Sequence, residues 1–130
     1  MHETRGPSPG AARYPDHQLR IAPLTNRVTA ESGATVLATS TAALLVSESG
    51  HPPVVYFPHQ DVRLENLFAT DSKSTCPFKG EAGYFALADD PQGQDVAWTY
   101  PAVYDEVAEL AGYIAFYEER VQVSQRATRP

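Results

Sequence analysis

The chain has 130 residues, 42% of them hydrophobic, and a formal net charge of −6, which suits one domain with a single modest core. Residues 17–123 carry six basic and fourteen acidic side chains. Nucleic-acid binding needs a basic face for the phosphate backbone, so we expect no nucleic-acid partner. We also expect no membrane association, because no apolar run approaches the roughly 20 residues of a membrane span.

A single cysteine, Cys76, sets the expected compartment. One cysteine cannot form an internal disulfide or a four-cysteine zinc site. An unpaired cysteine favours a reducing environment, and the first residues lack the apolar stretch of a secretory signal. We therefore predict a soluble cytoplasmic protein. The histidines show no compact pair spacing, so we predict no metal site and the sequence names no cofactor.

The two ends of the chain differ in composition from its middle. Residues 1–16 are rich in proline, glycine and small residues without apolar periodicity, which predicts a disordered arm. Residues 124–130 form a short basic tail that we also predict to be disordered. The single β-rich domain is expected at 17–123.

Short β-like runs follow from residue 19 to residue 57. They are LRIA (19–22), NRVTAE (26–31), ATVLAT (34–39), AALLVSE (42–48) and PVVYF (53–57). Turn signals every 8–12 residues indicate a meandering antiparallel sheet, and Ser32-Gly33 is the best hairpin turn. PVVYF is apolar on both alternating faces, which predicts a buried strand that Pro58 ends.

The stretch after Pro58 is harder to interpret. Residues 62–68 fit either a short strand or one helical turn. Residues 69–81 are polar, and we predict a long connection without regular structure. Connections of this length are uncommon in a compact domain and are usually functional or disordered.

Strand character returns at 83–88 and 96–100, on either side of a strong turn at 89–93. Beyond residue 101 the apolar period changes to four-and-three spacing, which predicts one face of a helix. The residues at that spacing are Val103, Val107, Leu110, Ile114, Tyr117 and Val121. The predicted fold class is therefore α+β, mainly β: a compact antiparallel sheet with one C-terminal helix.

Two short motifs carry a family resemblance. They are T-C-P-x-K-G at residues 75–80 and A-W-x-Y-P at residues 97–101. In this order they resemble the domain of unknown function 427 family over residues 19–123, a family also filed under a nucleotidyltransferase label. The resemblance implies a tent-like (Mss4-like) β fold, of the kind seen in small zinc-binding modules and methionine sulfoxide reductases. The paired cysteines that hold zinc in those proteins are missing here. The chain also lacks a glycine-rich phosphate loop and an Asp-x-Asp pair.

Candidate catalytic residues lie in the polar stretch. Lys79 is three residues from Cys76, across a proline-constrained turn, and a nearby cation favours the thiolate form needed by a nucleophile or redox thiol. Asp71 completes the predicted catalytic set. The alternative is that Cys76 is a small buried hydrophobic residue with a structural role.

Candidate ligand-binding residues are Tyr56, Arg63, Tyr84 and Trp98. Cations beside an aromatic wall suit a nucleotide or another anionic metabolite. Alternatively, Lys79 and Arg63 pair with Asp61 and Asp71 to fix a loop, and the aromatic residues belong to the core.

Two functional hypotheses follow. In the first, residues 56–84 and the Trp98 strand form a small-molecule pocket, with or without catalysis. In the second, the protein is a non-catalytic protein-interaction module with a structural Cys76. The sequence does not indicate the oligomeric state.

Overall fold

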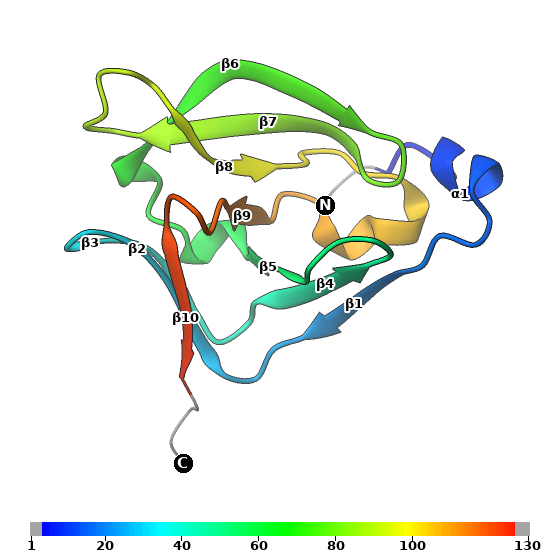
Figure 1. Ribbon diagram of the computed structural model, residues 1–130, viewed down its shortest axis with the longest axis horizontal. Helices are drawn as coiled ribbons and strands as arrows, with labels where there is room; N and C mark the ends of the chain where they lie inside the picture. Colours follow the sequence, from blue (N-terminus) through cyan, green and yellow to red (C-terminus); the bar gives the residue numbers. More distant parts are fainter. Residues whose placement is uncertain (1–3, 127–130) are drawn as a thin grey trace.

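The computed structural model describes residues 4–126, which form ten strands in two antiparallel sheets (Figure 1). The larger sheet has the order β1-β4-β5-β9-β8-β7-β6, and the smaller has the order β10-β2-β3. The prediction of a mainly β, single compact domain is confirmed. The strands are β1 (Leu19–Pro23), β2 (Arg27–Ser32), β3 (Thr35–Ser40), β4 (Leu44–Glu48), β5 (Val54–Phe57), β6 (Leu67–Cys76), β7 (Gly80–Leu87), β8 (Asp95–Thr99), β9 (Ile114–Phe116) and β10 (Gln122–Arg126).

The helices within residues 4–126 are short. They are the α-helix α1 (Pro9–Arg13) and the 3-10 helices η1 (His59–Asp61), η2 (Leu64–Asn66) and η3 (Asp105–Leu110). Each of them is too short or too polar to cross a membrane. Residues 62–68, predicted as a strand or one turn of helix, contain η2 and the first two residues of β6.

The predicted hairpin at Ser32-Gly33 is confirmed, because β2 and β3 pair across it. Gly33 has a φ of 59°, a left-handed conformation that glycine adopts without steric cost. The turn predicted at 89–93 likewise joins β7 to β8.

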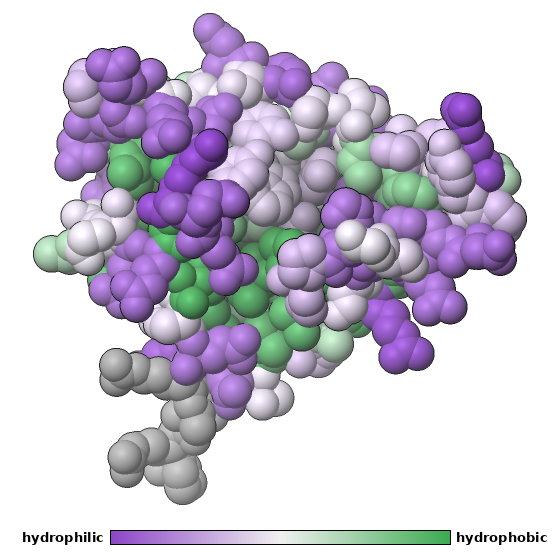
Figure 2. All heavy atoms as spheres, viewed as in Figure 1, coloured by the Kyte–Doolittle hydropathy of each residue, from purple (hydrophilic) through white to green (hydrophobic). Residues whose placement is uncertain are grey.

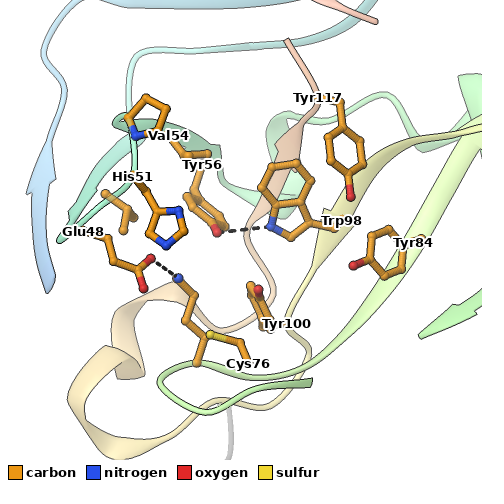
Figure 3. Close-up of a pocket in the computed structure, with 12 residues that line it drawn as sticks. Glu48, His51, Val54, Tyr56, Cys76, Tyr84, Trp98, Tyr100 and Tyr117 are labelled. Carbon is orange, nitrogen blue, oxygen red and sulfur yellow. Dashed lines mark hydrogen bonds and ion pairs between the residues drawn. The ribbon is translucent and has the colours of Figure 1, made fainter. Parts of the chain in front are cut away.

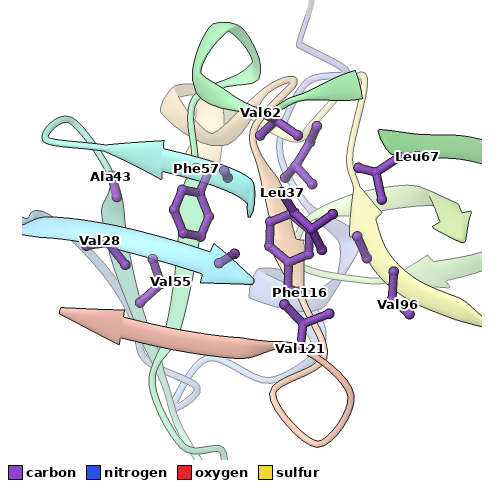
Figure 4. Close-up of a cluster of buried hydrophobic side chains, with 14 residues drawn as sticks. Val28, Leu37, Ala43, Val55, Phe57, Val62, Leu67, Val96, Phe116 and Val121 are labelled. Atoms are coloured by element: carbon purple, nitrogen blue, oxygen red, sulfur yellow. The ribbon is translucent and has the colours of Figure 1, made fainter. Parts of the chain in front are cut away.

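The middle strands of the larger sheet are buried on both faces. Val55 and Phe57 of β5 join a cluster with side chains from the smaller sheet (Figure 4), and Tyr56 points to the opposite face. In β9, Phe116 belongs to the same cluster as Phe57, and Ala115 belongs to a second cluster, with Tyr56, on the opposite face. Because alternate side chains leave a strand on opposite faces, a strand buried on both sides reads as continuously apolar.

The predicted C-terminal helix is wrong. The region folds as η3, then β9, then β10, and Gly112 has a φ of 79°, which an α-helix cannot contain. The four-and-three spacing arises because several short elements each bury one or more residues. All three residues of β9 are buried, so this strand shows no alternation in the sequence.

The prediction of an unstructured connection at 69–81 is also wrong. Residues 67–87 form the β6–β7 hairpin, with a shift of register between Ala69 and Lys73. Strand β6 lies at the edge of the sheet, and most of its side chains are exposed. An exposed edge strand can be polar on both faces, so the hydrophobic pattern does not reveal it.

The N-terminal segment differs from the predicted disordered arm over its described part, residues 4–16. The Arg5 amide donates to the Val103 carbonyl at 2.8 Å, and the Gly10 amide donates to the Pro77 carbonyl at 2.9 Å. Ser8 caps α1, and its own amide donates to the Glu106 carboxylate at 2.9 Å. These contacts are polar and mostly made by the backbone, so composition does not indicate them. Residues 1–3 lie outside the described part.

The C-terminal tail also differs from its prediction. Residues 122–126 form β10 and pair with β2. Residues 127–130 lie outside the described part.

Gly80 provides a test of the turn that joins β6 to β7. Its φ is 138°, and an added Cβ would lie 2.7 Å from the Ala102 carbonyl oxygen. We expect Gly80→Ala to lower the free energy of unfolding by about 3 kcal/mol, because strain and a backbone clash combine. Urea denaturation measures the change.

Gly33→Ala is the matched control, since its φ is also positive but an added Cβ would meet nothing within 4 Å. It should cost only about 1 kcal/mol. Equal losses in the two variants would contradict the close approach of Ala102 to Gly80.

Candidate functional site

A cavity of about 290 Å³ opens on one face of the larger sheet (Figure 3). In Figure 2, hydrophobic residues gather toward the middle of the face shown, and hydrophilic residues lie around its edge. The cavity is lined by Val46, Glu48, His51, Pro52, Val54, Tyr56, Cys76, Lys79, Tyr84, Trp98, Tyr100 and Tyr117.

A row of side chains across four neighbouring strands builds the aromatic wall. Tyr56 of β5 pairs with Ala115 of β9, Ala115 pairs with Trp98 of β8, and Trp98 pairs with Tyr84 of β7. Ala115 is small, so the larger rings on either side extend above it. Trp98 Nε1 donates to the Tyr56 hydroxyl at 3.2 Å, and the two rings meet edge to face. Trp98 and Tyr56 therefore meet over Ala115, which is fully buried beneath them, and the row presents a continuous aromatic surface to the cavity.

A buried ion pair forms the polar end of the cavity. Lys79 Nζ lies 2.5 Å from Glu48 Oε1, and the lysine is only 6% exposed. His17 Nε2 lies 2.9 Å from the other oxygen, Glu48 Oε2. The His17 ring stacks on Phe78 with centroids 3.8 Å apart, which ties the N-terminal segment to the turn that carries Lys79.

The charge of Glu48 is stabilised by its partners. Burial by itself would raise the pKa of Glu48, but hydrogen bonds and charge from Lys79 and His17 outweigh it and hold the pKa below its ordinary value. The carboxylate is therefore ionised at neutral pH, and both of its oxygens are engaged.

Three tyrosines of the cavity, Tyr56, Tyr100 and Tyr117, have a raised pKa and stay protonated at neutral pH. Burial raises the pKa of Tyr56 and of Tyr100 well above the ordinary value, because the charged form loses its hydration. Burial also raises the pKa of Tyr117, helped by Tyr84 beside it. Tyr84 shares a hydrogen bond of 2.6 Å with Ser74 of β6.

The structure brings five of the seven predicted site residues together in the cavity wall: Tyr56, Cys76, Lys79, Tyr84 and Trp98. Arg63 and Asp71 do not line the cavity, and both are exposed on other parts of the surface. The polar stretch is a hairpin, so residues near in sequence to Lys79 leave its strands in different directions.

The loop-fixing pairs considered from the sequence are not the ones observed. Lys79 pairs with Glu48, and Asp61 accepts a hydrogen bond of 2.6 Å from the Ser40 hydroxyl. Sequence reasoning missed Glu48, Tyr100, Tyr117 and His17. Tyr100 belongs to the A-W-x-Y-P motif, which could have suggested it, but no sequence signal marks Glu48 or His17.

His51, His59, Asp61 and Asp71 have side chains of types that bind metals. Within the described part of the chain, no three His, Cys, Asp or Glu side chains are grouped closely enough to hold a metal ion.

Comparison with known families gives a match over most of the chain. The model of the family described as domain of unknown function DUF427 matches residues 20–127. The chain belongs to this family. A search of curated proteins finds no match. The DUF427 match confirms the resemblance carried by the two short motifs, and its description assigns no activity.

The ion pair predicts a specific pH dependence of stability. In Glu48→Gln, buried Lys79 loses its charged partner, so we expect the free energy of unfolding at pH 7 to fall by about 2–4 kcal/mol. Because the folded-state pKa of Glu48 lies below its ordinary value of 4.5, the wild-type advantage is fully present above pH 4.5 and declines as the pH falls through the folded pKa. Urea denaturation between pH 3 and pH 7 measures both variants.

Glu65→Gln, which changes an exposed acid, is the control and should follow the wild type at every pH. A wild-type advantage over Glu48→Gln that stays constant down to pH 3 would show that the charge of Glu48 does not stabilise the fold.

Proposed function

We propose that the protein binds a small organic molecule in the cavity between the aromatic row and the Lys79–Glu48 pair. The observation that carries this proposal is the burial of Lys79 at the wall of an open cavity. Removing an ion pair from water is costly, and apolar residues of the same size would stabilise the fold as well or better. A charge pair retained at a cavity wall is therefore typical of a site that recognises a ligand.

The size and charge of the cavity limit the ligand. A volume of about 290 Å³ lies at the lower end of the range for ligand pockets, so the ligand is small. Lys79 is the one lysine or arginine among the lining residues, and Glu48 balances its charge. A nucleoside triphosphate needs several positive groups around its phosphates, so a neutral or singly charged molecule fits better.

Cys76 and Lys79 are the reactive groups that such a ligand would contact. Both line the cavity, and Cys76 is partly exposed there. We propose a binding function and assign no reaction. The free thiol is also consistent with a reducing compartment such as the cytoplasm.

A ligand screen tests the proposal. Trp98, the single tryptophan, lies in the cavity wall, so its fluorescence should report a bound ligand. We expect at least one class of small metabolites to change this fluorescence and to raise the melting temperature. Lys79→Met should remove the response, because it deletes the charge and preserves most of the volume.

Lys73→Met is the matched control, since Lys73 is the other lysine of the β6–β7 hairpin and is exposed. It should respond as the wild type does. If no compound in a broad metabolite screen changes either signal, the protein-interaction module becomes the better hypothesis, and Phe68, 41% exposed on the edge strand, is where a partner search should begin.

Alkylation of Cys76 gives an independent test. With iodoacetamide, Cys76 should react in the native protein more slowly than in urea, because it is only partly exposed at the cavity wall. A ligand found in the screen should slow the reaction further. Mass spectrometry follows the single cysteine without ambiguity. Absence of labelling before unfolding would indicate a purely structural cysteine, as the alternative sequence hypothesis holds.

A further inference from the structure

The hydrogen-bonding groups of the cavity are unevenly used, and the imbalance indicates what the ligand must supply. Among the described residues no side-chain nitrogen or oxygen is buried without a partner, so the unused groups of the cavity face its open space. A ligand that displaces water from such groups must replace their hydrogen bonds. The groups that face the cavity can be counted as donors and acceptors from their observed partners.

Tyr100 and Tyr56 each retain a proton to donate. Tyr100 is 8% exposed, and its hydroxyl makes no hydrogen bond with any of residues 4–126. The Tyr56 hydroxyl accepts from Trp98 Nε1, which leaves its own proton for another acceptor. In Figure 3 both hydroxyls point toward the same open space. Because their pKa values are raised, both are hydroxyl donors at neutral pH.

Lys79 adds further donors at the same end of the cavity. A lysine ammonium group has three N–H bonds, and one of them is directed to Glu48 Oε1. The other two make no hydrogen bond with any of residues 4–126, and Lys79 lines the cavity.

The strongest acceptor of the cavity is already in use. Both oxygens of Glu48 are engaged, one by Lys79 and the other by His17. What this end of the cavity still offers to a ligand is therefore two tyrosine hydroxyls, which can donate, and the ammonium group of Lys79, which only donates. A ligand with oxygen acceptors can use all of these groups, whereas a ligand with donors alone leaves the Lys79 N–H bonds unused.

We propose that the ligand is a small carboxylic acid, bound as its carboxylate. The carboxylate oxygens accept from the hydroxyls of Tyr56 and Tyr100 and from the ammonium group of Lys79. The planar or apolar body of the acid lies against Trp98 in the aromatic row. This inference rests on the proposed binding function of the same cavity and adds the chemical class of the ligand.

Charge favours a carboxylate over a phosphate group. The Lys79–Glu48 pair is neutral as a unit, so a single negative charge gains the Lys79 contact without a large excess of like charge. A phosphate ester with nearly two negative charges would meet the same carboxylate of Glu48 and a chain of net charge −6. Neutral hydroxyl donors suit a ligand with one negative charge, because they add no positive charge that could balance a second one.

Three matched probes test the inference on the full-length protein. Benzoate, benzamide and benzyltrimethylammonium share a phenyl ring and carry a carboxylate, a neutral amide and a cation. Titrations followed by Trp98 fluorescence and by the indole N–H signal in NMR spectra give the dissociation constants. We expect benzoate to bind at least tenfold more tightly than the cation, since a hydrogen bond to a charged group is worth about 1.5–3 kcal/mol.

Two variants locate the binding. Tyr100→Phe removes one hydroxyl and no protein hydrogen bond, so it should leave the melting temperature unchanged and weaken benzoate binding about tenfold. Tyr56→Phe should weaken benzoate binding similarly. Tyr104→Phe deletes a hydroxyl that does not line the cavity and should change neither property.

The outcomes separate this inference from the broader proposal. Preferred binding of the cation, equal effects of Tyr100→Phe and Tyr104→Phe on benzoate, or a screened ligand of another class with no response to benzoate would overturn the carboxylate and leave the binding function intact. If neither the three probes nor the metabolite screen perturbs Trp98, both proposals fail together.

Discussion

The contact between Lys79 and Glu48 is the constraint on which the shape of the larger sheet depends. Glu48 ends β4, and Lys79 immediately precedes β7, four strand positions away in the order β4-β5-β9-β8-β7. Neighbouring strands lie about 4.8 Å apart, so a flat sheet would separate β4 and β7 by roughly 19 Å. Two side chains cannot span that distance and still meet at 2.5 Å. The sheet must therefore curve, and the cavity lies on the inner side of the curve.

The same curvature explains why the face with the cavity carries two kinds of residue. Around η3 this face is closed by apolar side chains such as Val107 and Leu110, which pack with Tyr56 and Ala115. Toward β7 and β4 it opens, and hydroxyls, a thiol and an ion pair replace the apolar groups. One continuous surface thus passes from core to site, and the aromatic row belongs to both. This dual position accounts for tyrosines that are buried yet present their hydroxyl groups to open space.

Much of the fold could be predicted from the sequence, because most strands appear in it as a single apolar run with clear ends. The strands around Val28, Val55 and Trp98 were found because each is bounded by glycine, proline or a polar turn. The errors have physical causes. Strand β9 is buried on both faces and follows a short 3-10 helix, so its residues extend an apparent helical period. Strand β6 is exposed at an edge, so it shows no apolar pattern. Membership of the DUF427 family could also be predicted, because the two motifs that carry the resemblance are short and can be read directly in the sequence.

Five of the seven residues singled out from the sequence line the cavity, and Arg63 and Asp71 do not. The polar stretch at residues 69–81 contains Cys76 and Lys79, and the tight β6–β7 turn puts both against the cavity. Glu48 could not be predicted in this way. Its position beside Lys79 depends on the order of the strands in the sheet, which is set by long-range pairing and not by local sequence. Asp71 was chosen for its proximity in sequence, and strand geometry directs it elsewhere.

The N-terminal segment has a consequence for how the chain folds. Ser8 binds Glu106 across 98 residues, and β2 pairs with β10 near the opposite end of the chain. Ser8 therefore gains this partner only after the chain has been synthesised as far as Glu106. Contacts of such wide sequence separation slow folding, since loop closure must precede the gain in contact energy. Assembly of the smaller sheet and docking of α1 are consequently late events in the folding of this domain.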